Sequence, residues 1–203
     1  MIWPNGDYYI GEFKFGKRHG NGKRVNDDGS YYEGQYKDDQ PSGTGVWRWP
    51  DGERYNGEWR DGKFNGQGQK VLPDGTIFTG LWEDNEPNGL GVCTYPDGSK
   101  YDGDWKNGKY DGIGIKQLED GTTFQGMFFA GKEKGQGKKV LPNGTVFEGT
   151  WDGENFLKGQ VTYADGSSYD GYFNNGLPEG EGTKTWADGK KYEGIWIAGL
   201  PVG

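Results

Sequence analysis

The sequence has little of what enzymes and disulfide-stabilised proteins need. Its 203 residues include one cysteine, Cys93, and one histidine, His19. A lone cysteine excludes an intramolecular disulfide framework and is typical of a reducing compartment. No stretch approaches the ~18 apolar residues of a membrane-spanning helix, and no basic segment followed by an apolar one opens the chain as a secretory signal would. We therefore expect a cytoplasmic location, with the cilium or cytoskeleton as the more specific expectation.

Aliphatic residues are also scarce. Only 31% of the residues are hydrophobic, and aromatic residues alone make up 16% of the chain, alongside 41 glycines. That is too little aliphatic material for an ordinary core in a chain of this length. We expect aromatic rings packed against glycines to replace it, because aromatic pairs contribute about 0.5 to 1.5 kcal/mol beyond their burial.

What the sequence has in abundance is one repeated frame. The frame begins with Tyr or Phe (position 1), continues with glycine at position 3 and a large aromatic residue at position 5, and recurs every 23 residues, with one step of 22. A fixed period of this size indicates a repeat architecture. The frames begin at residues 9, 32, 55, 78, 101, 124, 147, 169 and 192.

Each frame predicts a β-hairpin. Positions 1, 3 and 5 share one face of a strand because side chains alternate with period two, and the residues between them are mostly polar. We expect positions 6 to 13 to form a loop and positions 14 to 18 to form the return strand, with a bulky residue at position 18. Pro-Asp-Gly turns such as Pro50-Asp51-Gly52 join successive frames, and Asp-Gly between apolar alternating runs is a strong hairpin signal. Position 8 is usually glycine, but Asp39 and Asn85 stand there in two repeats and tolerate the same left-handed backbone conformation.

The pattern resembles the MORN (membrane occupation and recognition nexus) repeat. Its consensus reads here as Tyr55-x-Gly57-x-Trp59-x-x-Gly62-x-x-x-Gly66-x-Gly68, followed by Asp74-Gly75. The resemblance implies an all-β fold, an elongated single-layer antiparallel sheet of tandem 23-residue hairpins. We predict one MORN array over residues 1–203, with a partial repeat at 1–8 and another beginning at 192.

Two irregularities mark the array. The chain begins and ends within a repeat, with Gly203 at position 12, so we expect it to be a segment of a longer polypeptide or to be capped by partners; self-association through open sheet edges is a further expectation. The repeat that begins at Phe147 lacks one residue and has Leu157 where the position-12 glycine belongs. We expect a change of register or twist there, as a tolerated deletion or as a bend that receives a partner.

Catalysis finds no support. His19 and Cys93 lie three repeats apart, and at ~9.6 Å per hairpin they cannot act together. We interpret Cys93 as a packing residue and His19 as a solvated loop residue. Neither can complete a zinc site, so we expect no metal, no cofactor and no enzyme activity.

The net charge of −8 argues against nucleic-acid binding. It also weakens the case for anionic lipid, which clustered Lys and Arg usually recognise. The best basic stripe occupies position 16 and is interrupted by Trp47, Cys93 and Val161; its residues are Arg24, Lys70, Lys116, Lys139 and Lys184.

The aromatic residues are better candidates for partner binding than the basic stripe. The resemblance implies that partners bind along the face that carries positions 1 and 5, although the same rings also have to pack the fold. In the central repeats these residues are Tyr55, Trp59, Phe78, Trp82, Tyr101 and Trp105. A second set lies at position 10, where loop aromatics either contact a partner or fold back on their own hairpin: Phe64, Tyr110 and Phe156.

We therefore predict a non-catalytic scaffold that binds other proteins, as a structural part of a cytoskeletal or ciliary axonemal assembly. One alternative is a phosphoinositide-binding or regulatory array of a larger enzyme such as a phosphatidylinositol phosphate kinase. Another is an aromatic-rich carbohydrate-binding repeat, which the 23-residue period and the absence of a signal segment disfavour.

Overall fold

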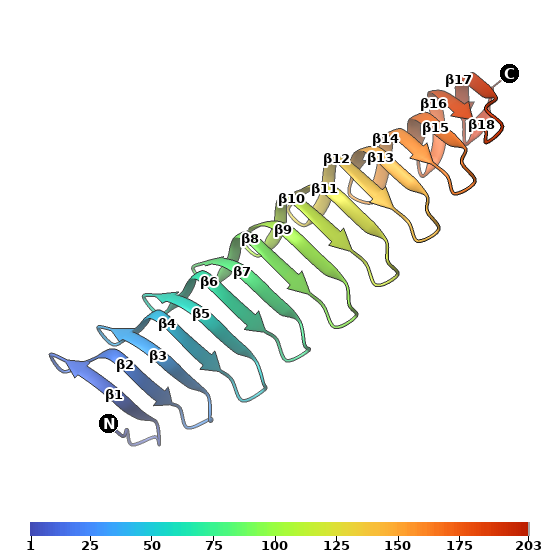
Figure 1. The fold of residues 1–203 in the computed structure, drawn as a ribbon. Coiled ribbons are helices and arrows are strands. Elements are labelled where there is room, and N and C mark those ends of the chain that lie inside the picture. The colour runs from blue at the N-terminus through green and yellow to red at the C-terminus, as the bar shows by residue number, and fades with distance from the viewer. Residues whose placement is uncertain (203) are drawn as a thin grey trace. The chain divides into compact units, whose positions relative to one another are not determined.

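The computed structural model describes residues 1–202, which form strands and turns with no helix among them (Figure 1). Gly203, the predicted position-12 glycine of the last repeat, lies outside the described residues. The chain divides into two compact units. The first contains Met1–Asp97 and Trp105–Gly108, and the second contains Gly98–Asp104 and the chain from Lys109 onward. The assignment of residues 1–203 to a single array stays a prediction.

Each unit is built from successive hairpins. The strands of the first unit are β1 (Tyr8–Lys14), β2 (Lys17–Val25), β3 (Tyr31–Lys37), β4 (Gln40–Arg48), β5 (Arg54–Arg60), β6 (Lys63–Val71), β7 (Ile77–Glu83) and β8 (Glu86–Thr94). β9 (Lys100–Lys106) contributes residues to both units. The strands of the second unit are β10 (Lys109–Gln117), β11 (Thr123–Phe129), β12 (Lys132–Val140), β13 (Val146–Asp152), β14 (Asn155–Thr162), β15 (Ser168–Asn174), β16 (Leu177–Thr185), β17 (Lys191–Ile197) and β18 (Leu200–Pro201).

Within each unit neighbouring strands pair antiparallel and in chain order. β5 pairs with β6 so that Gly57 faces Gly68, and β6 pairs with β7 so that Gly68 faces Gly80. The glycines of positions 3 and 14 therefore run across the sheet in one row. The predicted fold class, an all-β tandem series of antiparallel hairpins, is confirmed.

The predicted extent of the return strand is wrong. It spans positions 9 to 17, as in β6, and the loop is a two-residue turn at positions 7 and 8 rather than eight residues long. Asp61 and Gly62 occupy that turn with φ values of 50° and 77°, as a tight hairpin turn requires. Asp39 and Asn85 adopt positive φ values of 73° and 76° at position 8, as predicted.

A β-bulge explains why a glycine at position 12 does not end the strand. The register shifts between Gly57 and Trp59, so that Trp59 pairs with Phe64 while Gly57 still pairs with Gly68. Gly66 has a φ of 68° within the bulge. The Glu58 carboxylate at position 4 stabilises it by accepting a hydrogen bond from the Gln67 amide at 3.1 Å. Glu12, Gln35 and Asp104 accept the equivalent bond in their own repeats.

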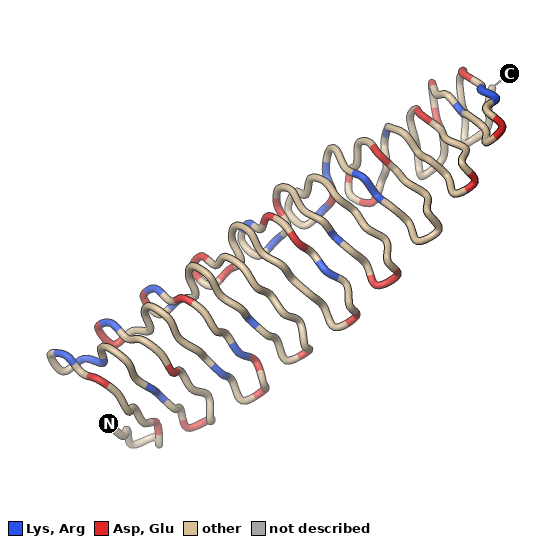
Figure 2. Tube along the Cα trace, viewed as in Figure 1, with Lys and Arg blue, Asp and Glu red and all other residues tan. Residues whose placement is uncertain are grey.

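The turns between repeats follow one rule. The Asp74 carboxylate accepts a hydrogen bond from the Thr76 amide at 2.8 Å, and the Gly75 amide donates to the Leu72 carbonyl at 3.0 Å. Most of these turns contain an acidic residue, because Asp usually occupies this position (Figure 2).

Candidate functional site: the aromatic face

The side of the sheet that carries positions 1, 3 and 5, here called the aromatic face, is built around rings that lie across glycines. The Tyr55 side chain is fully buried. A Cβ atom at Gly57 would lie 2.7 Å from the Tyr55 hydroxyl oxygen, and one at Gly68 would lie 2.3 Å from it. Position 14 is therefore glycine because the ring occupies the space of any side chain there. At position 3 the backbone of the neighbouring strand is closer still, with the Gly68 Cα atom at 2.5 Å and the Gln67 carbonyl oxygen at 2.6 Å.

The buried tyrosines at position 1 keep a hydrogen bond. The Tyr55 hydroxyl donates to the Glu58 carbonyl at 2.9 Å, three residues along the same strand. Tyr9, Tyr32 and Tyr101 make the same bond in their repeats. Burial raises the pKa of the Tyr32, Tyr55 and Tyr101 hydroxyls well above the usual value, because a phenolate would lose its hydration there.

The large aromatic residues at position 5 join neighbouring hairpins. The Trp82 ring meets Phe78 of its own repeat edge to face at 4.9 Å between centroids and Tyr55 of the preceding repeat at 5.4 Å. Its indole nitrogen donates to the Gly68 carbonyl at 3.1 Å. In the second unit, Phe128 lies 5.1 Å from Tyr101 in the same manner. The first unit thus has a continuous ladder of edge-to-face rings, and the ladder of the second unit continues from Trp151 to Phe173 through tilted contacts with Phe156.

The aromatic residues at position 10 belong to this ladder. Phe64 stacks on Tyr55 with centroids 3.8 Å apart and planes 10° apart, and Tyr110 stacks on Tyr101 with the same values. These residues lie in strands β6 and β10, so placing them in a loop was wrong. They fold back on their own hairpin, which is one of the two alternatives that the sequence left open.

In the repeat that begins at Phe147, the position-10 ring takes over the role of position 1. Phe156 is buried and lies 5.0 Å from Phe173 of the next repeat, whereas Phe147 is half-buried. The missing residue is absorbed within the bulge, because Leu157 alone is left unpaired there and Gly149 still pairs with Gly159. The register change is therefore local.

These contacts limit what the predicted partner-binding residues can offer. Eight of them are buried, and Tyr110 is half-buried. Their binding to a partner stays a prediction, but their burial restricts a partner to ring edges. The buried eight are Tyr55, Trp59, Phe64, Phe78, Trp82, Tyr101, Trp105 and Phe156.

Three cations of the predicted lipid-facing stripe are already paired. Lys70 lies 2.8 Å from the Glu53 carboxylate, and Lys139 lies 3.0 Å from the Glu133 carboxylate. The Lys139 ammonium also lies 4.4 Å from the centre of the Trp151 ring. Position 16 therefore places Lys on the aromatic face, where rings and carboxylates hold it.

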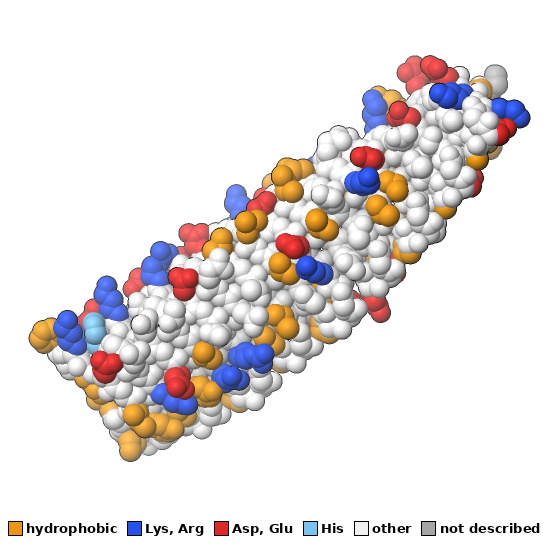
Figure 3. Space-filling view, viewed as in Figure 1, with side chains coloured by type: hydrophobic (Ala, Val, Ile, Leu, Met, Phe, Trp, Pro, Cys, Tyr) orange, Lys and Arg blue, Asp and Glu red, His pale blue; other side chains and the backbone are white. Residues whose placement is uncertain are grey.

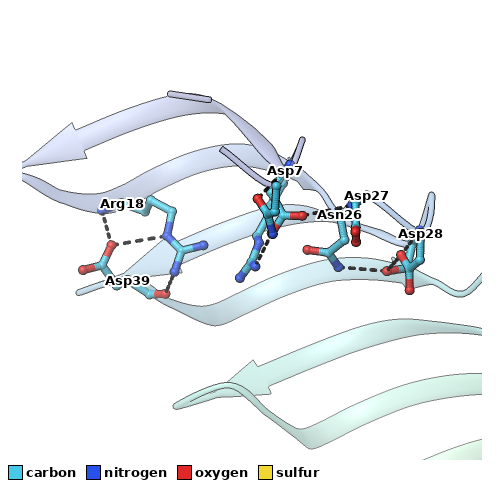
Figure 4. Close-up of polar contacts among 9 residues, drawn as sticks. Asp7, Arg18, Asn26, Asp27, Asp28 and Asp39 are labelled. Carbon is cyan, nitrogen blue, oxygen red and sulfur yellow. Dashed lines mark hydrogen bonds and ion pairs between the residues drawn. The ribbon is translucent and has the colours of Figure 1, made fainter. Parts of the chain in front are cut away.

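In the first repeats, arginine side chains are paired with carboxylates in the same way (Figure 4). Arg24 forms an ion pair with Asp7 at 2.9 Å, and the other Asp7 carboxylate oxygen accepts a hydrogen bond from the Asp27 amide at 3.0 Å. Arg18 binds the carboxylate and carbonyl of Asp39 in the next hairpin turn. Hydrogen bonds from Arg24 and the Asp27 amide hold the pKa of the Asp7 carboxyl below its usual value.

The remaining two residues of the stripe have no ion pair among the described residues. The Lys184 ammonium donates to the Ser167 hydroxyl at 3.1 Å and lies 4.1 Å from the centre of the Tyr163 ring. Lys116 is half-buried. Lipid binding by the stripe stays a prediction.

Next to these cations lies a row of residues that the sequence pattern identified only as bulky. We call the position-18 residues the outer row. The Trp49 ring lies on the aromatic face 6.4 Å from Phe64, with the Lys70 ammonium 5.8 Å from its centre. Leu118 is 39% exposed and Trp186 is 42% exposed. Half-exposed members of the row are Trp49, Leu72, Leu141 and Tyr163.

Reactive groups do not gather anywhere among residues 1–202. Cys93 is buried, and burial raises the pKa of its thiol, in agreement with the predicted packing role. His19 lies half-buried in β2, so its placement in a solvated loop was wrong. Within those residues, no three His, Cys, Asp or Glu side chains are grouped so as to bind a metal, and no helix could span a membrane.

The repeat frame matches a known family. A family model described as the MORN repeat matches residues 9–31, 32–54, 55–77, 78–100, 101–123, 124–146, 169–191 and 192–203. Residues 1–8 and 147–168 are not matched, and the second of these segments is the repeat that lacks one residue.

Several solved structures are similar in part. The TCP domain of SAS-4 (dCPAP) from Drosophila melanogaster, solved with a proline-rich motif of Ana2 (dSTIL), is 11% identical over 92% of this chain and 88% of that chain, with a TM-score of 0.44. The G-box domain of the microcephaly protein CPAP is 14% identical over 97% of both chains, with a TM-score of 0.42. The TCP10 domain of Danio rerio CPAP is 18% identical over 97% of this chain and 99% of that chain, with a TM-score of 0.33. The family assignment rests on the repeat model, since these TM-scores are low.

Proposed function

Because the chain belongs to the MORN repeat family, we propose that it is a non-catalytic scaffold that binds other proteins along the margin of its aromatic face. Among residues 1–202, His19 in β2 and Cys93 in β8 lie in different hairpins. The fold supplies a surface that repeats with the spacing of the hairpins, about 9.6 Å for two strands. A partner that lies along such a surface meets the same kind of contact at each repeat.

The outer row carries this proposal. It presents apolar and aromatic side chains that the fold leaves half-exposed, such as Leu118 and Trp186. Trp49 and Tyr163 stand beside Lys70 and Lys184, whose ammonium groups are held over their rings. Trp and Tyr are enriched in protein-binding surfaces and among the residues that contribute most to binding. The rings of positions 1 and 5 then serve to hold this row in place.

A structural role in a cytoskeletal or ciliary axonemal assembly is the more specific part of the proposal. The family resemblance alone supports it. A phosphoinositide-binding role is less well supported, because Arg24, Lys70 and Lys139 are neutralised by carboxylates within the chain. A regulatory array within a larger enzyme would use the same surface. It would differ from a scaffold only in the identity of the bound partner.

The proposal is tested by capture from a native lysate at moderate salt, followed by mass spectrometry. The immobilised chain is compared with the outer-row variant Leu118→Ser/Trp186→Ser. The control variant, Ile10→Ser/Phe15→Ser, removes two apolar side chains that are 69% and 94% exposed outside the row. Circular dichroism establishes that all three proteins are equally folded.

We expect a small set of proteins to be retained by the wild type and the control but lost by the outer-row variant. Equal retention by all three proteins contradicts the proposal. A parallel flotation assay with vesicles that contain phosphatidylinositol phosphates tests the lipid alternative. Vesicle binding that Lys116→Glu/Lys184→Glu abolishes, with no proteins retained, would replace our proposal with that alternative.

A further inference from the structure

The outer row of the first unit is bordered by aspartates at the turns between repeats. Each of these turns places an aspartate at position 20, two residues after the outer-row residue, and the aspartates are exposed. We call them the acidic row. Its members are Asp51 after Trp49, Asp74 after Leu72 and Asp97 after Tyr95, with Asp28 at the same position of the preceding turn. Apolar and negatively charged side chains therefore recur together, once per repeat.

The turns hold the carboxylates of the acidic row in place. One Asp51 oxygen accepts a hydrogen bond from the Glu53 amide at 2.9 Å, and one Asp74 oxygen accepts a hydrogen bond from the Thr76 amide at 2.8 Å. A carboxylate has two oxygens with about four acceptor positions between them. Each turn therefore fixes its carboxylate and still leaves acceptor positions for a cation of a partner.

The position-16 cations beside the acidic row are paired with other carboxylates. Arg24 pairs with Asp7 at 2.9 Å, and Lys70 pairs with Glu53 at 2.8 Å. Position 16 is uncharged in the other two repeats of the first unit. This position therefore does not compensate the charge of the acidic row.

Two arginines flank the Asp51 turn but lie on the opposite side of the sheet. Arg48 and Arg54 pair across β4 and β5 and occupy positions 17 and 23. Because side chains alternate along a strand, these positions face away from positions 1, 16 and 18. A partner that lies on the outer row therefore meets the aspartates of the acidic row and not these arginines.

The rest of the first unit does not combine apolar side chains with charge of one sign in this way. Its other edge consists of hairpin turns in which Lys37 and Lys63 stand close to Asp38 and Asp61. Figure 2 shows blue and red segments close together at that edge and mainly red ones at the turns between repeats. On the face that Figure 3 shows, exposed hydrophobic side chains lie among charged side chains of both signs.

The corresponding row of the second unit is less acidic. Asn143 stands in place of one aspartate, and Asp188 is paired with Lys190 at 3.0 Å. The Lys184 ammonium also lies over the outer-row residue Tyr163. A partner that is attracted by negative charge therefore has its stronger site on the first unit.

We infer that the outer row of the first unit binds a basic amphipathic helix of the partner. The inference rests on the proposed function and adds to it the chemistry of the bound segment. The apolar side of the helix covers Trp49, Leu72 and Tyr95. Lys and Arg side chains along one flank of the helix pair with the acidic row, so the helix lies across the strands.

The spacing of the acidic row suits a helix. Neighbouring aspartates are two strands apart, ~9.6 Å, so the four of them span ~29 Å. Seven residues of a helix rise ~10.5 Å, and three heptads rise ~31.5 Å. The two periods differ by about 1 Å per repeat, which the long side chains of Lys and Arg accommodate. An extended strand returns a side chain to the same face every ~6.7 Å, which does not match.

Apolar contact distinguishes the helix from a polyproline segment of similar period, ~9.3 Å per turn. A polyproline II segment turns one residue in three toward the outer row. An amphipathic helix turns two or more apolar residues per heptad toward the same surface. The helix therefore covers more of the half-exposed side chains at Trp49, Leu72 and Tyr95 for each repeat that it crosses.

A synthetic peptide of three heptads tests the inference. It has leucine at positions a and d and arginine at positions e and g, where like charges keep the peptides from pairing with one another. Fluorescence anisotropy of the labelled peptide measures its binding to the full chain. We expect binding that weakens as salt is added, because salt screens exposed charges, and no binding of a peptide with glutamate in place of arginine.

The variant Asp51→Asn/Asp74→Asn removes two charges of the acidic row. It should weaken binding of the peptide by about tenfold or more. Asparagine preserves the turn, since Asn143 accepts the same hydrogen bond from the Thr145 amide at 2.9 Å in the second unit. Circular dichroism establishes that the variant is folded.

The matched control is Asp61→Asn/Asp84→Asn, which lowers the net charge of the first unit by the same amount. Asp61 and Asp84 lie in hairpin turns at the other edge with φ values of 50° and 48°, a conformation that asparagine tolerates. The control should bind the peptide with unchanged affinity. Failure of the wild type to bind the peptide overturns the inference, and so does equal affinity for the wild type and both variants.

Two further outcomes separate the parts of the account. A peptide with proline at the centre of each heptad cannot form a helix, and binding as tight as that of the original peptide overturns the helical conformation. In the lysate assay described above, proteins that Asp51→Asn/Asp74→Asn retains and Leu118→Ser/Trp186→Ser loses would support the proposed function and overturn this inference. Loss of the same proteins by both variants supports the inference.

Discussion

The Tyr55 hydroxyl oxygen lies 2.3 Å from the point where a Cβ atom of residue 68 would be, and residue 68 is glycine. The same relation joins Tyr32 to Gly45 at 2.2 Å and Tyr101 to Gly114 at 2.4 Å. Position 14 is therefore glycine because a side chain has no space there, and not because the backbone has a positive φ angle. The rings can lie flat on the sheet only because this row is bare, so the glycine row and the ring ladder form one structural unit.

Gly68→Ala should destabilise the chain by about 1 to 3 kcal/mol, the usual cost of overpacking. The added methyl group would overlap the end of the Tyr55 ring, whose Cζ atom would lie 2.6 Å from it. Urea denaturation gives the free energy of unfolding. A double-mutant cycle with Tyr55→Leu isolates the cause, because leucine does not reach residue 68. A coupling free energy near zero between the two substitutions would contradict the account.

Phe156→Ala should cost more stability than Phe147→Ala, which reverses the order expected from their positions in the frame. Phe156 is buried against Trp151 and Phe173, with centroids 4.8 Å and 5.0 Å away. Removing a buried phenylalanine costs about 3 to 5 kcal/mol, whereas Phe147 is half-buried and should cost less. Thermal or urea unfolding compares the two variants, and an equal or larger effect at Phe147 would refute the exchange of roles.

Lys139→Met should destabilise the chain by about 3 kcal/mol, because it leaves a buried carboxylate without its partner. The Glu133 side chain is 9% exposed and the Lys139 side chain 17% exposed. Lys134→Met is the control in the same strand. Its ion pair with Asp152 is 56% and 59% exposed, so it should cost no more than about 1 kcal/mol. Adding Glu133→Gln to Lys139→Met should recover part of the loss, and no recovery would contradict this interpretation.

Stability should fall at alkaline pH. Burial raises the pKa of Tyr36 to about 12, with the Arg18 guanidinium opposing the shift, and burial raises the pKa of Tyr32 and Tyr55 further. The folded chain keeps these protons above the ordinary pKa of about 10, and the unfolded chain loses them. Their contribution is therefore complete below pH about 10 and is lost as the pH rises through the folded-state values.

The expected slope is about 1.4 kcal/mol per pH unit for each such tyrosine. Urea midpoints at pH 8, 10 and 11.5 measure it, with absorbance at 295 nm reporting phenolate. Tyr36→Phe removes one titrating group and should reduce the slope between pH 10 and 12. A stability that does not change over this range would show that these hydroxyls are accessible to water in the folded chain.

The period, the hairpins and the row of glycines could be predicted from the sequence because each leaves a periodic trace. Glycines equivalent to Gly57 and Gly68 recur at fixed positions of the frame, and turns such as Asp74-Gly75 mark the junctions between repeats. The length of the return strand could not be predicted in the same way. Glycines at positions 8 and 12 look like a loop locally, and only the cross-strand pairing of Trp59 with Phe64 shows that the strand continues.

The candidate site was predicted less well. Phe64 and Phe156 were candidates for partner contact, but both are buried, Phe64 against Tyr55 of its own hairpin and Phe156 against Phe173 of the next repeat. One signal was present, since position 10 holds rings, proline or long side chains and never glycine. The ion pairs of the position-16 lysines left no periodic signal in the sequence. The carboxylates that pair with Lys70 and Lys139 stand at different positions of the frame.

The central claim is that the rings hold the fold while the outer row binds the partner. Oxidative footprinting of the chain, alone and with the captured protein, tests it most directly by measuring the modification rate of each exposed side chain. We predict that Trp186, Leu118 and Trp49 are protected in the complex while Phe15, which is 94% exposed at a hairpin turn, is modified at an unchanged rate. Unchanged rates along the outer row, with protection elsewhere on the sheet, would contradict the claim.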